Sequence, residues 1–374
     1  MSIKHLIITM MAMVATTAIN AQTTTDVATI RKNAQAGNVK AQVQLANMLL
    51  AGNGVKTNHA EAVQWYQKAA NKGNLEAQFN LAYCYEQGYG VQKNLDEAVK
   101  WYTKAANQGN LSAMNSLGNC YDTGGEGFDK NYAKAAEWYR KAADKGYGPA
   151  MFNLGNCYYL MKGVDLDYKE AIKWWEKAAA KGNAAAYYNL GYCYMKGEGV
   201  EPNPEKAFSY FVRLADTGDP RAQFEVARMY QNGEGVAQDN AKALEYYTKS
   251  AEKSYPSAQM ALGRYYDSGT IVEQDYEQAA KWYLQAANQG NADAQYNIGN
   301  MYYNGMGIER NYEEAFKWME KAALQGHPSA QTGLGLCYYY GNGVKKNKDL
   351  GREWINKAAI MGDDYAKQVL KKLK

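Results

Sequence analysis

The chain has 374 residues, of which 47% are hydrophobic and 21% are charged. Its 42 Lys and Arg residues nearly balance 38 Asp and Glu residues, so the formal net charge is only +4. A charge this weak, which we expect to be dispersed over the chain, argues against a nucleic-acid-binding surface.

Residues 1–21 have the pattern of a secretory signal peptide. Lys4 supplies a charged start, the segment from Leu6 to Ile19 is mostly apolar, and small residues lead to a cleavage site after Ala21. This apolar run is too short for a transmembrane helix, and no later segment resembles one. We therefore predict an exported bacterial protein, either periplasmic or secreted.

The rest of the chain repeats one pattern. Each copy begins with an alanine, and the copies are 36 residues apart except for one step of 37. The first residues of the copies are Ala41, Ala77, Ala113, Ala150, Ala186, Ala222, Ala258, Ala294, Ala330 and, for a tenth copy that is cut short, Ala366. A period of this length indicates stacked helical repeats. Positions within a repeat are counted below from this alanine as position 0.

Each copy predicts a pair of helices. In the second copy, apolar or small residues recur with helical spacing from Ala77 to Gly88, and a Gly-x-Gly loop follows. Position 17, Asn94 in this copy, is Asn or Asp in all nine copies and is typical of a helix N-cap. The second helix carries Trp101 at position 24 and Ala106 at position 29. We expect these rings and methyl groups to interdigitate with neighbouring helices.

This pattern resembles the Sel-1-like repeat (SLR), a member of the tetratricopeptide-like superfamily. The eighth copy carries the family signature at Ala294, Ile298, Gly299, Tyr302, Gly305, Gly307, Ile308, Asn311, Ala315, Trp318, Lys321, Ala322, Ala323 and Gly326. The copies depart from the signature only locally, with Met161 for the first loop glycine, Ile271 for the second, and an extra loop residue around Gly124–Gly127.

We predict an all-α fold, a right-handed α-solenoid of stacked antiparallel helix hairpins with 36-residue repeats. After the signal peptide, residues 22–40 form an N-terminal capping helix equivalent to half a repeat. Residues 41–365 form nine Sel-1-like repeats, and residues 366–374 form a partial repeat that caps the C-terminal end.

The cysteines and histidines do not predict a metal or catalytic site. All five cysteines occupy position 7, which holds Met or Tyr in the other copies, so we expect free thiols in a buried apolar slot. The resemblance includes a branch with two disulfide-bonded cysteines per repeat that is associated with penicillin binding, but the matching positions here look like alanine. The three histidines are scattered, and we predict no cofactor.

A basic residue recurs at position 27 of eight copies, as in Lys104. It could form a row of cations for an anionic polymer, but we favour a role at the C-terminal end of each second helix, with ion pairs such as Glu137–Lys141 and Glu245–Lys249.

The solvent side of the first helices is the candidate binding surface. The resemblance implies that these helices line a concave wall, where amides can bind the backbone of an extended peptide and Tyr and Arg favour interface contacts. The candidate residues are Asn80, Tyr83, Asn119, Asn153, Asn156, Tyr159, Asn189, Tyr192, Arg228, Arg264, Asn297, Asn300 and Tyr303. The alternative is that these side chains only form hydrogen bonds between adjacent repeats.

We therefore predict an exported, non-enzymatic scaffold that binds a protein or an extended peptide. The alternative is a cell-envelope enzyme or a peptidoglycan- or penicillin-binding protein, as in the cysteine-rich branch. The sequence does not identify the partner.

Overall fold

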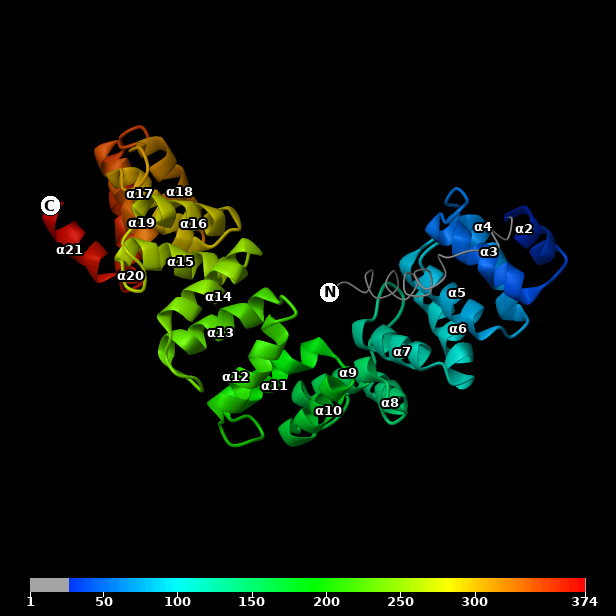
Figure 1. Ribbon diagram of the computed structural model, residues 1–374. Helices are drawn as coiled ribbons and strands as arrows, with labels where there is room; N and C mark the ends of the chain where they lie inside the picture. Colours follow the sequence, from blue (N-terminus) through cyan, green and yellow to red (C-terminus); the bar gives the residue numbers. More distant parts are fainter. Residues whose placement is uncertain (1–26, 374) are drawn as a thin grey trace. The chain divides into compact units, whose positions relative to one another are not determined.

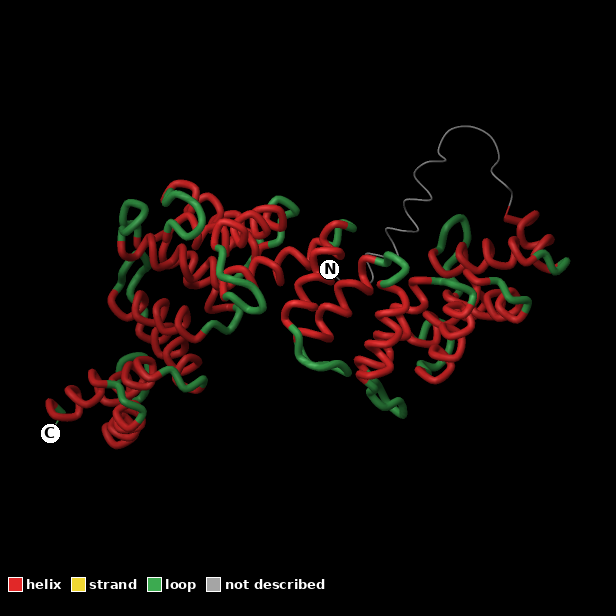
Figure 2. The backbone as a smooth tube through the Cα atoms, turned by 90° about the horizontal axis from the view of Figure 1, so that it is seen from below, coloured by secondary structure: helices red, strands yellow, loops and turns green. Residues whose placement is uncertain are grey.

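The computed structural model describes residues 27–373, so the predicted signal peptide lies outside the described residues. The described chain consists of helices joined by short loops, without a β-strand (Figures 1 and 2). The helices are α2 (Val27–Gln35), α3 (Val39–Ala51), α4 (His59–Asn71), α5 (Leu75–Gln87), α6 (Leu95–Asn107), α7 (Leu111–Thr123), α8 (Tyr132–Ala143), α9 (Gly148–Tyr159), α10 (Tyr168–Ala180), α11 (Ala184–Lys196), α12 (Pro204–Ala215), α13 (Pro220–Asn232), α14 (Asn240–Glu252), α15 (Pro256–Ser268), α16 (Tyr276–Asn288), α17 (Ala292–Asn304), α18 (Tyr312–Leu324), α19 (Pro328–Tyr340), α20 (Lys348–Ile360) and α21 (Asp364–Lys372). The predicted all-α repeat fold is confirmed.

The helices group into two compact units, and the boundary lies between Leu166 and Asp167. The first unit contains α2 to α9 and the second contains α10 to α21, so each begins with a second helix and ends with a first helix. The boundary falls in the α9–α10 loop, where Met161 replaces glycine and adopts a φ of 54°. The sequence pattern continues through this loop and did not predict the division.

The predicted N-caps at position 17 are confirmed. In the second hairpin, the Asn94 side chain accepts a hydrogen bond from the backbone N–H of Glu97. The backbone N–H of Asn94 in turn donates to the Tyr85 carbonyl at the end of the first helix, at 2.9 Å. One residue therefore starts the second helix and closes the loop that precedes it.

The second glycine of the Gly-x-Gly loop sets the spacing between repeats. Gly307 has a φ of 63°, and a Cβ atom built on it would lie 2.1 Å from the carbonyl atoms of Tyr276 in the preceding repeat. A Cβ atom built on Gly90 would likewise lie 2.3 Å from the carbonyl atoms of His59. Glycine is needed here because the backbone is left-handed and because a neighbouring helix occupies the space of a side chain.

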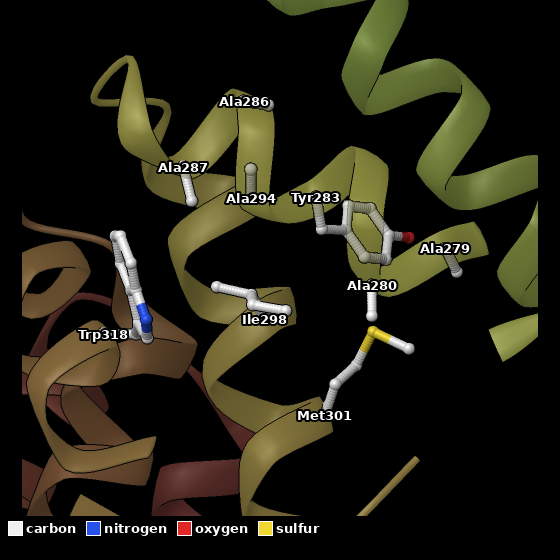
Figure 3. Close-up of a cluster of buried hydrophobic side chains, with 9 residues drawn as sticks. All are labelled: Ala279, Ala280, Tyr283, Ala286, Ala287, Ala294, Ile298, Met301 and Trp318. Atoms are coloured by element: carbon white, nitrogen blue, oxygen red, sulfur yellow. The ribbon is translucent and has the colours of Figure 1, made fainter. Parts of the chain in front are cut away.

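The core forms where each second helix packs on the next first helix. In the cluster of Figure 3, Ala286 and Ala287 of α16 lie against Ala294 and Ile298 of α17, and Trp318 of α18 packs alongside. These residues are at most 7% exposed. The predicted alternation of large rings and alanines therefore fills the space between repeats.

Buried glutamines at position 1 connect consecutive repeats by hydrogen bonds. The Gln295 side chain donates to the Ala287 carbonyl of the preceding repeat at 3.2 Å and accepts from Gln325, later in its own repeat, at 2.8 Å. Gln78 and Gln259 have the same two partners, with Gln108 and Gln289 as donors. The side-chain oxygens of Gln42, Gln223 and Gln331 have no hydrogen-bond partner in the described chain. In these three repeats the position of the donor glutamine is occupied by Lys72, Lys253 and Met361.

All five cysteines are free and buried, as predicted. Burial raises the pKa of the Cys84, Cys120, Cys157 and Cys193 thiols to about 12, and that of Cys337 to about 11. They are apolar core residues rather than reactive thiols.

Candidate functional site

The candidate residues all lie on one side of the first helices, at repeat positions 3, 6 and 9. We call this side the first-helix face. In residues 27–166 it carries Asn80 and Tyr83 on α5, Asn119 on α7, and Asn153, Asn156 and Tyr159 on α9. In residues 167–373 it carries Asn189 and Tyr192 on α11, Arg228 on α13, Arg264 on α15, and Asn297, Asn300 and Tyr303 on α17.

Buried tyrosines of the second helices extend to this face. At position 25, the hydroxyl groups of Tyr66 and Tyr139 donate to the Asn47 and Asn119 side chains, at 2.6 and 2.8 Å. Tyr102, Tyr247 and Tyr283 donate instead to position 9, to Glu86 at 2.7 Å, Gln231 at 2.8 Å and Asp267 at 3.4 Å. The polar side chain on the face therefore keeps a buried hydroxyl paired.

Other candidate amides bind asparagine side chains of the preceding repeat. The Asn153 side chain donates to Asn115 at 2.9 Å and to Asn119 at 3.3 Å. Asn80 donates to Asn47 at 3.3 Å. For these residues the structure shows the inter-repeat hydrogen bonding that the sequence left as the alternative. Asn156, Tyr159 and Asn189 also have interaction partners.

Arg228, Tyr303 and Tyr83 of the candidate residues contact neighbouring side chains in different ways. The Arg228 guanidinium binds Glu225 at 3.1 Å and Glu234 at 2.8 Å. The Tyr303 hydroxyl accepts from the Asn342 side chain at 2.7 Å. The Tyr83 ring lies 5.8 Å from the Tyr89 ring, and burial raises its pKa to about 12.

Three candidates on two consecutive repeats are not held by a side-chain hydrogen bond or ion pair to a described residue. The side chains of Arg264, Asn297 and Asn300 form no hydrogen bond or ion pair with the described part of the chain. Asn300 occupies the position of Asn119, but the second-helix residue that would face it is Met319, which has no hydroxyl group. Arg264 is exposed. Tyr192 is 40% exposed and is likewise without a described hydrogen bond.

Arg264 lies close enough to the buried tyrosines to act on them electrostatically. Burial raises the pKa of Tyr283, Asp267 raises it further, and the positive charge of Arg264 opposes both effects. The α15–α17 part of the face thus offers a guanidinium group and two amides, which can donate to peptide carbonyls or carboxylates and accept from peptide N–H groups. We call Arg264, Asn297 and Asn300 the unpaired set.

The pairing of tyrosines with the face was not predicted, although the sequence contains a signal for it. Tyrosine occupies position 25 in five repeats. In each of them its hydroxyl donates a hydrogen bond to a polar side chain of the first helix, which is Asn47, Glu86, Asn119, Gln231 or Asp267. The other four repeats have Trp175, Phe211, Met319 and Ile355 at this position. Comparing the two positions across the repeats would have identified the side chains that accept a hydrogen bond from a buried tyrosine.

The position 27 lysines lie over the aromatic rings at position 24. The ammonium nitrogen of Lys104 is 3.7 Å from the centre of the Trp101 ring, and that of Lys321 is 4.0 Å from the Trp318 ring. The expected ion pairs Glu137–Lys141 and Glu245–Lys249 are present, at 2.6 and 2.5 Å. The structure therefore gives these lysines a local role that includes a cation–π contact the sequence analysis missed.

No group of three or more potential metal ligands occurs within residues 27–373. In the same part of the chain, no helix combines the length and apolar character needed to cross a membrane.

Comparison with protein families finds the Sel1 repeat nine times in succession. The matched segments are 39–74, 75–110, 111–147, 148–183, 184–219, 220–255, 256–291, 292–327 and 328–363. No match to a curated protein was found.

Two similar solved structures come from bacteria. One is a protective antigen of uropathogenic Escherichia coli strains that displays an SLR fold; it is 30% identical, has a TM-score of 0.57, and the match covers 91% of this chain and 88% of the antigen. The other is a Sel1 repeat protein from Oxalobacter formigenes, 32% identical, with a TM-score of 0.57 and coverage of 66% of this chain and 96% of that protein.

Proposed function

Because this chain belongs to the Sel1 repeat family, whose fold is typically a scaffold for protein–protein interaction, we propose that it binds an extended peptide segment of a partner protein on the first-helix face of α15 and α17. The family match supports protein binding in general. The peptide and its place on this face are our inference from the side chains.

The observation that carries the proposal is the division of the face into used and unused polar groups. Asn80, Asn119 and Asn153 already bind residues of this chain. The unpaired set is available for a ligand, and a stacked scaffold holds it in place before binding, so little conformational entropy is lost when a peptide docks. We also propose that the protein is exported, which the pattern of residues 1–21 supports.

Site-specific photo-crosslinking tests this proposal. A photoreactive phenylalanine analogue replaces Asn300 in cells, with a second protein carrying the analogue at Lys281, an exposed residue of α16, as the control. We expect a discrete crosslinked partner from position 300 and none from position 281. Equal crosslinking from both positions, or none from position 300, would contradict binding at this face. Cell fractionation of the same samples tests export.

A further inference from the structure

The positive charge of the chain is concentrated at its C-terminal end, which corrects our expectation of a dispersed charge. Residues 340–374 contain nine Lys or Arg and four Asp or Glu, a net charge of +5. Because the whole chain carries +4, residues 1–339 together carry −1.

Most of these cations gather at one end of the last helix pair. The Arg352 side chain in α20 donates to the Leu373 carbonyl at 2.7 Å, which places the start of α20 beside the end of α21. Lys345, Lys346 and Lys348 precede or open α20, and Lys371 and Lys372 end α21. All six residues are exposed, and none forms an ion pair with a carboxylate of the described chain.

Exposed apolar side chains lie at the opposite end of the same helix pair. Ile360 is 79% exposed, Met361 54% and Tyr365 59%. Ile360 occupies position 30 of its repeat, and Leu324 at the same position of the preceding repeat is 71% exposed. The seven earlier repeats have Asn71, Asn107, Asp144, Ala180, Asp216, Glu252 and Asn288 there. Large apolar residues therefore enter this exposed position only in the last two repeats.

We propose that α20, α21 and the loop before α20 form a peripheral binding surface for an anionic lipid membrane. Anionic headgroups attract Lys and Arg near the surface by about 1 kcal/mol each. The interface below the headgroups accepts Ile, Met and Tyr side chains. A nucleic acid would pair with the cations but would leave Ile360 and Met361 in water. This surface is separate from the unpaired set and does not depend on the proposed peptide binding.

Vesicle co-sedimentation tests this proposal with the full chain. The probes are vesicles of phosphatidylcholine alone and vesicles of phosphatidylcholine mixed with phosphatidylglycerol, each at low and high ionic strength. We expect binding to the anionic vesicles at low ionic strength, and a strong decrease at high ionic strength or without the anionic lipid.

Charge-matched variants locate the binding surface. The variant Lys345→Gln/Lys346→Gln/Lys371→Gln/Lys372→Gln should lose at least about tenfold in vesicle partitioning. The control Lys100→Gln/Lys173→Gln/Lys281→Gln/Lys317→Gln removes four exposed lysines of other second helices and should retain wild-type partitioning. Both variants keep residues 1–21, so that apolar segment contributes equally. Equal losses in the two variants would overturn the proposal.

The variant Ile360→Ser/Met361→Ser tests the contribution of the exposed apolar side chains to membrane binding. It should weaken partitioning to anionic vesicles severalfold while leaving the circular dichroism melting curve unchanged. Analytical ultracentrifugation of the same variant examines self-association. Self-association that this variant abolishes, without binding of the wild-type protein to vesicles, would show that the patch binds a second copy and would overturn the proposal. Binding of the wild-type protein to an acidic protein or nucleic acid but not to vesicles would also overturn it.

Discussion

At the residue scale, the polar side chains of the first-helix face are divided between folding and exposure to solvent. A buried tyrosine hydroxyl needs an acceptor, and Asn47, Glu86, Asn119, Gln231 and Asp267 supply it. Where the second helix has Met319 instead of a tyrosine, Asn300 receives no hydrogen bond from a buried hydroxyl group of the described chain. The same residue type at the same repeat position therefore has different roles.

Glu86 makes one of these pairs sensitive to pH. Burial raises its pKa above the ordinary value of 4.5, although the hydrogen bond from Tyr102 and the charge of Lys93 oppose the shift. The folded state then holds the proton more tightly than the unfolded state. The contribution of Glu86 to the free energy of unfolding is therefore largest below pH 4.5 and decreases as pH rises through the raised pKa.

The variant Glu86→Gln keeps an acceptor for Tyr102 and removes the charge. We expect it to be more stable than the wild type in urea unfolding at neutral pH, with this advantage decreasing toward pH 4. Glu201→Gln, an exposed loop substitution, is the control and should change little. A constant difference between Glu86→Gln and wild type at every pH would contradict the explanation.

The unpaired oxygen of Gln223 predicts a stabilising substitution. Lys253 donates to the Gly218 carbonyl at 2.5 Å, whereas its counterpart Gln108 donates both to the equivalent Gly73 carbonyl and to Gln78. Lys253→Gln should therefore keep one hydrogen bond and add a second one to Gln223, raising the free energy of unfolding by about 1 kcal/mol. Urea unfolding measures this change.

The matched control is Lys145→Gln. Lys145 occupies the equivalent position of its repeat, but position 1 of that repeat is Met114, which offers no acceptor in place of the glutamine. No gain is expected from the control. Equal gains in the two variants would show that removing a lysine, and not the added hydrogen bond, stabilises the protein.

At the scale of the helix pair, the N-cap, the loop and the two glycines fix how one hairpin meets the next. The first loop glycine ends the first helix in a left-handed conformation, as Gly305 does with a φ of 72°. The second glycine lies against the backbone of the preceding repeat. These two glycines have different physical requirements.

Substitution of the second glycine should be costly. Gly307→Ala forces a left-handed alanine and places a methyl group against the Tyr276 carbonyl, so we expect a loss of about 2–4 kcal/mol in the free energy of unfolding. Gly326→Ala is the control, because Gly326 has a φ of 90° but no atom within 4 Å of its Cβ position. The control should lose only about 1 kcal/mol. Losses of equal size would refute the role of the close contact.

The cysteines test the packing of the first helices. Because burial raises the pKa of Cys84 to about 12, and all five thiols are buried, native protein should not react with a thiol reagent at neutral pH. In denaturant, all five thiols should react. Rapid labelling of the native protein would mean that position 7 is not part of a closed core.

Much of the hairpin could be predicted from the sequence, because its signals are local and occur nine times. The position 17 N-caps and the buried position 7 cysteines are examples. The glutamine connections and the tyrosine pairs were missed because they join residues of different helices. Gln295 and Gln325 are 30 residues apart, and Tyr139 and Asn119 are 20 apart. Neither contact follows from the pattern of a single helix.

At the scale of the whole molecule, the sequence predicted nine equivalent repeats, whereas the described chain divides into residues 27–166 and 167–373. The concentration of positive charge in residues 340–374 was also not predicted. The net charge of the whole chain is small and does not show that the positive excess belongs to this segment. A periodic sequence predicts the repeating element well. It predicts poorly how individual repeats differ, and these differences carry the candidate binding surfaces.

The central claim is that the unpaired set binds a partner while the paired amides hold the repeats together. Pull-down of the partner identified by crosslinking, now without the photoreactive residue, and urea unfolding should therefore be measured side by side for two triple variants, Arg264→Ala/Asn297→Ala/Asn300→Ala and Asn80→Ala/Asn119→Ala/Asn153→Ala. We predict that the first variant loses capture and keeps wild-type stability. The second should retain capture but lose about 1–3 kcal/mol of stability, because the Tyr139 hydroxyl loses its acceptor. Full capture by the first variant, or a loss of stability in it as large as in the second, would contradict the claim.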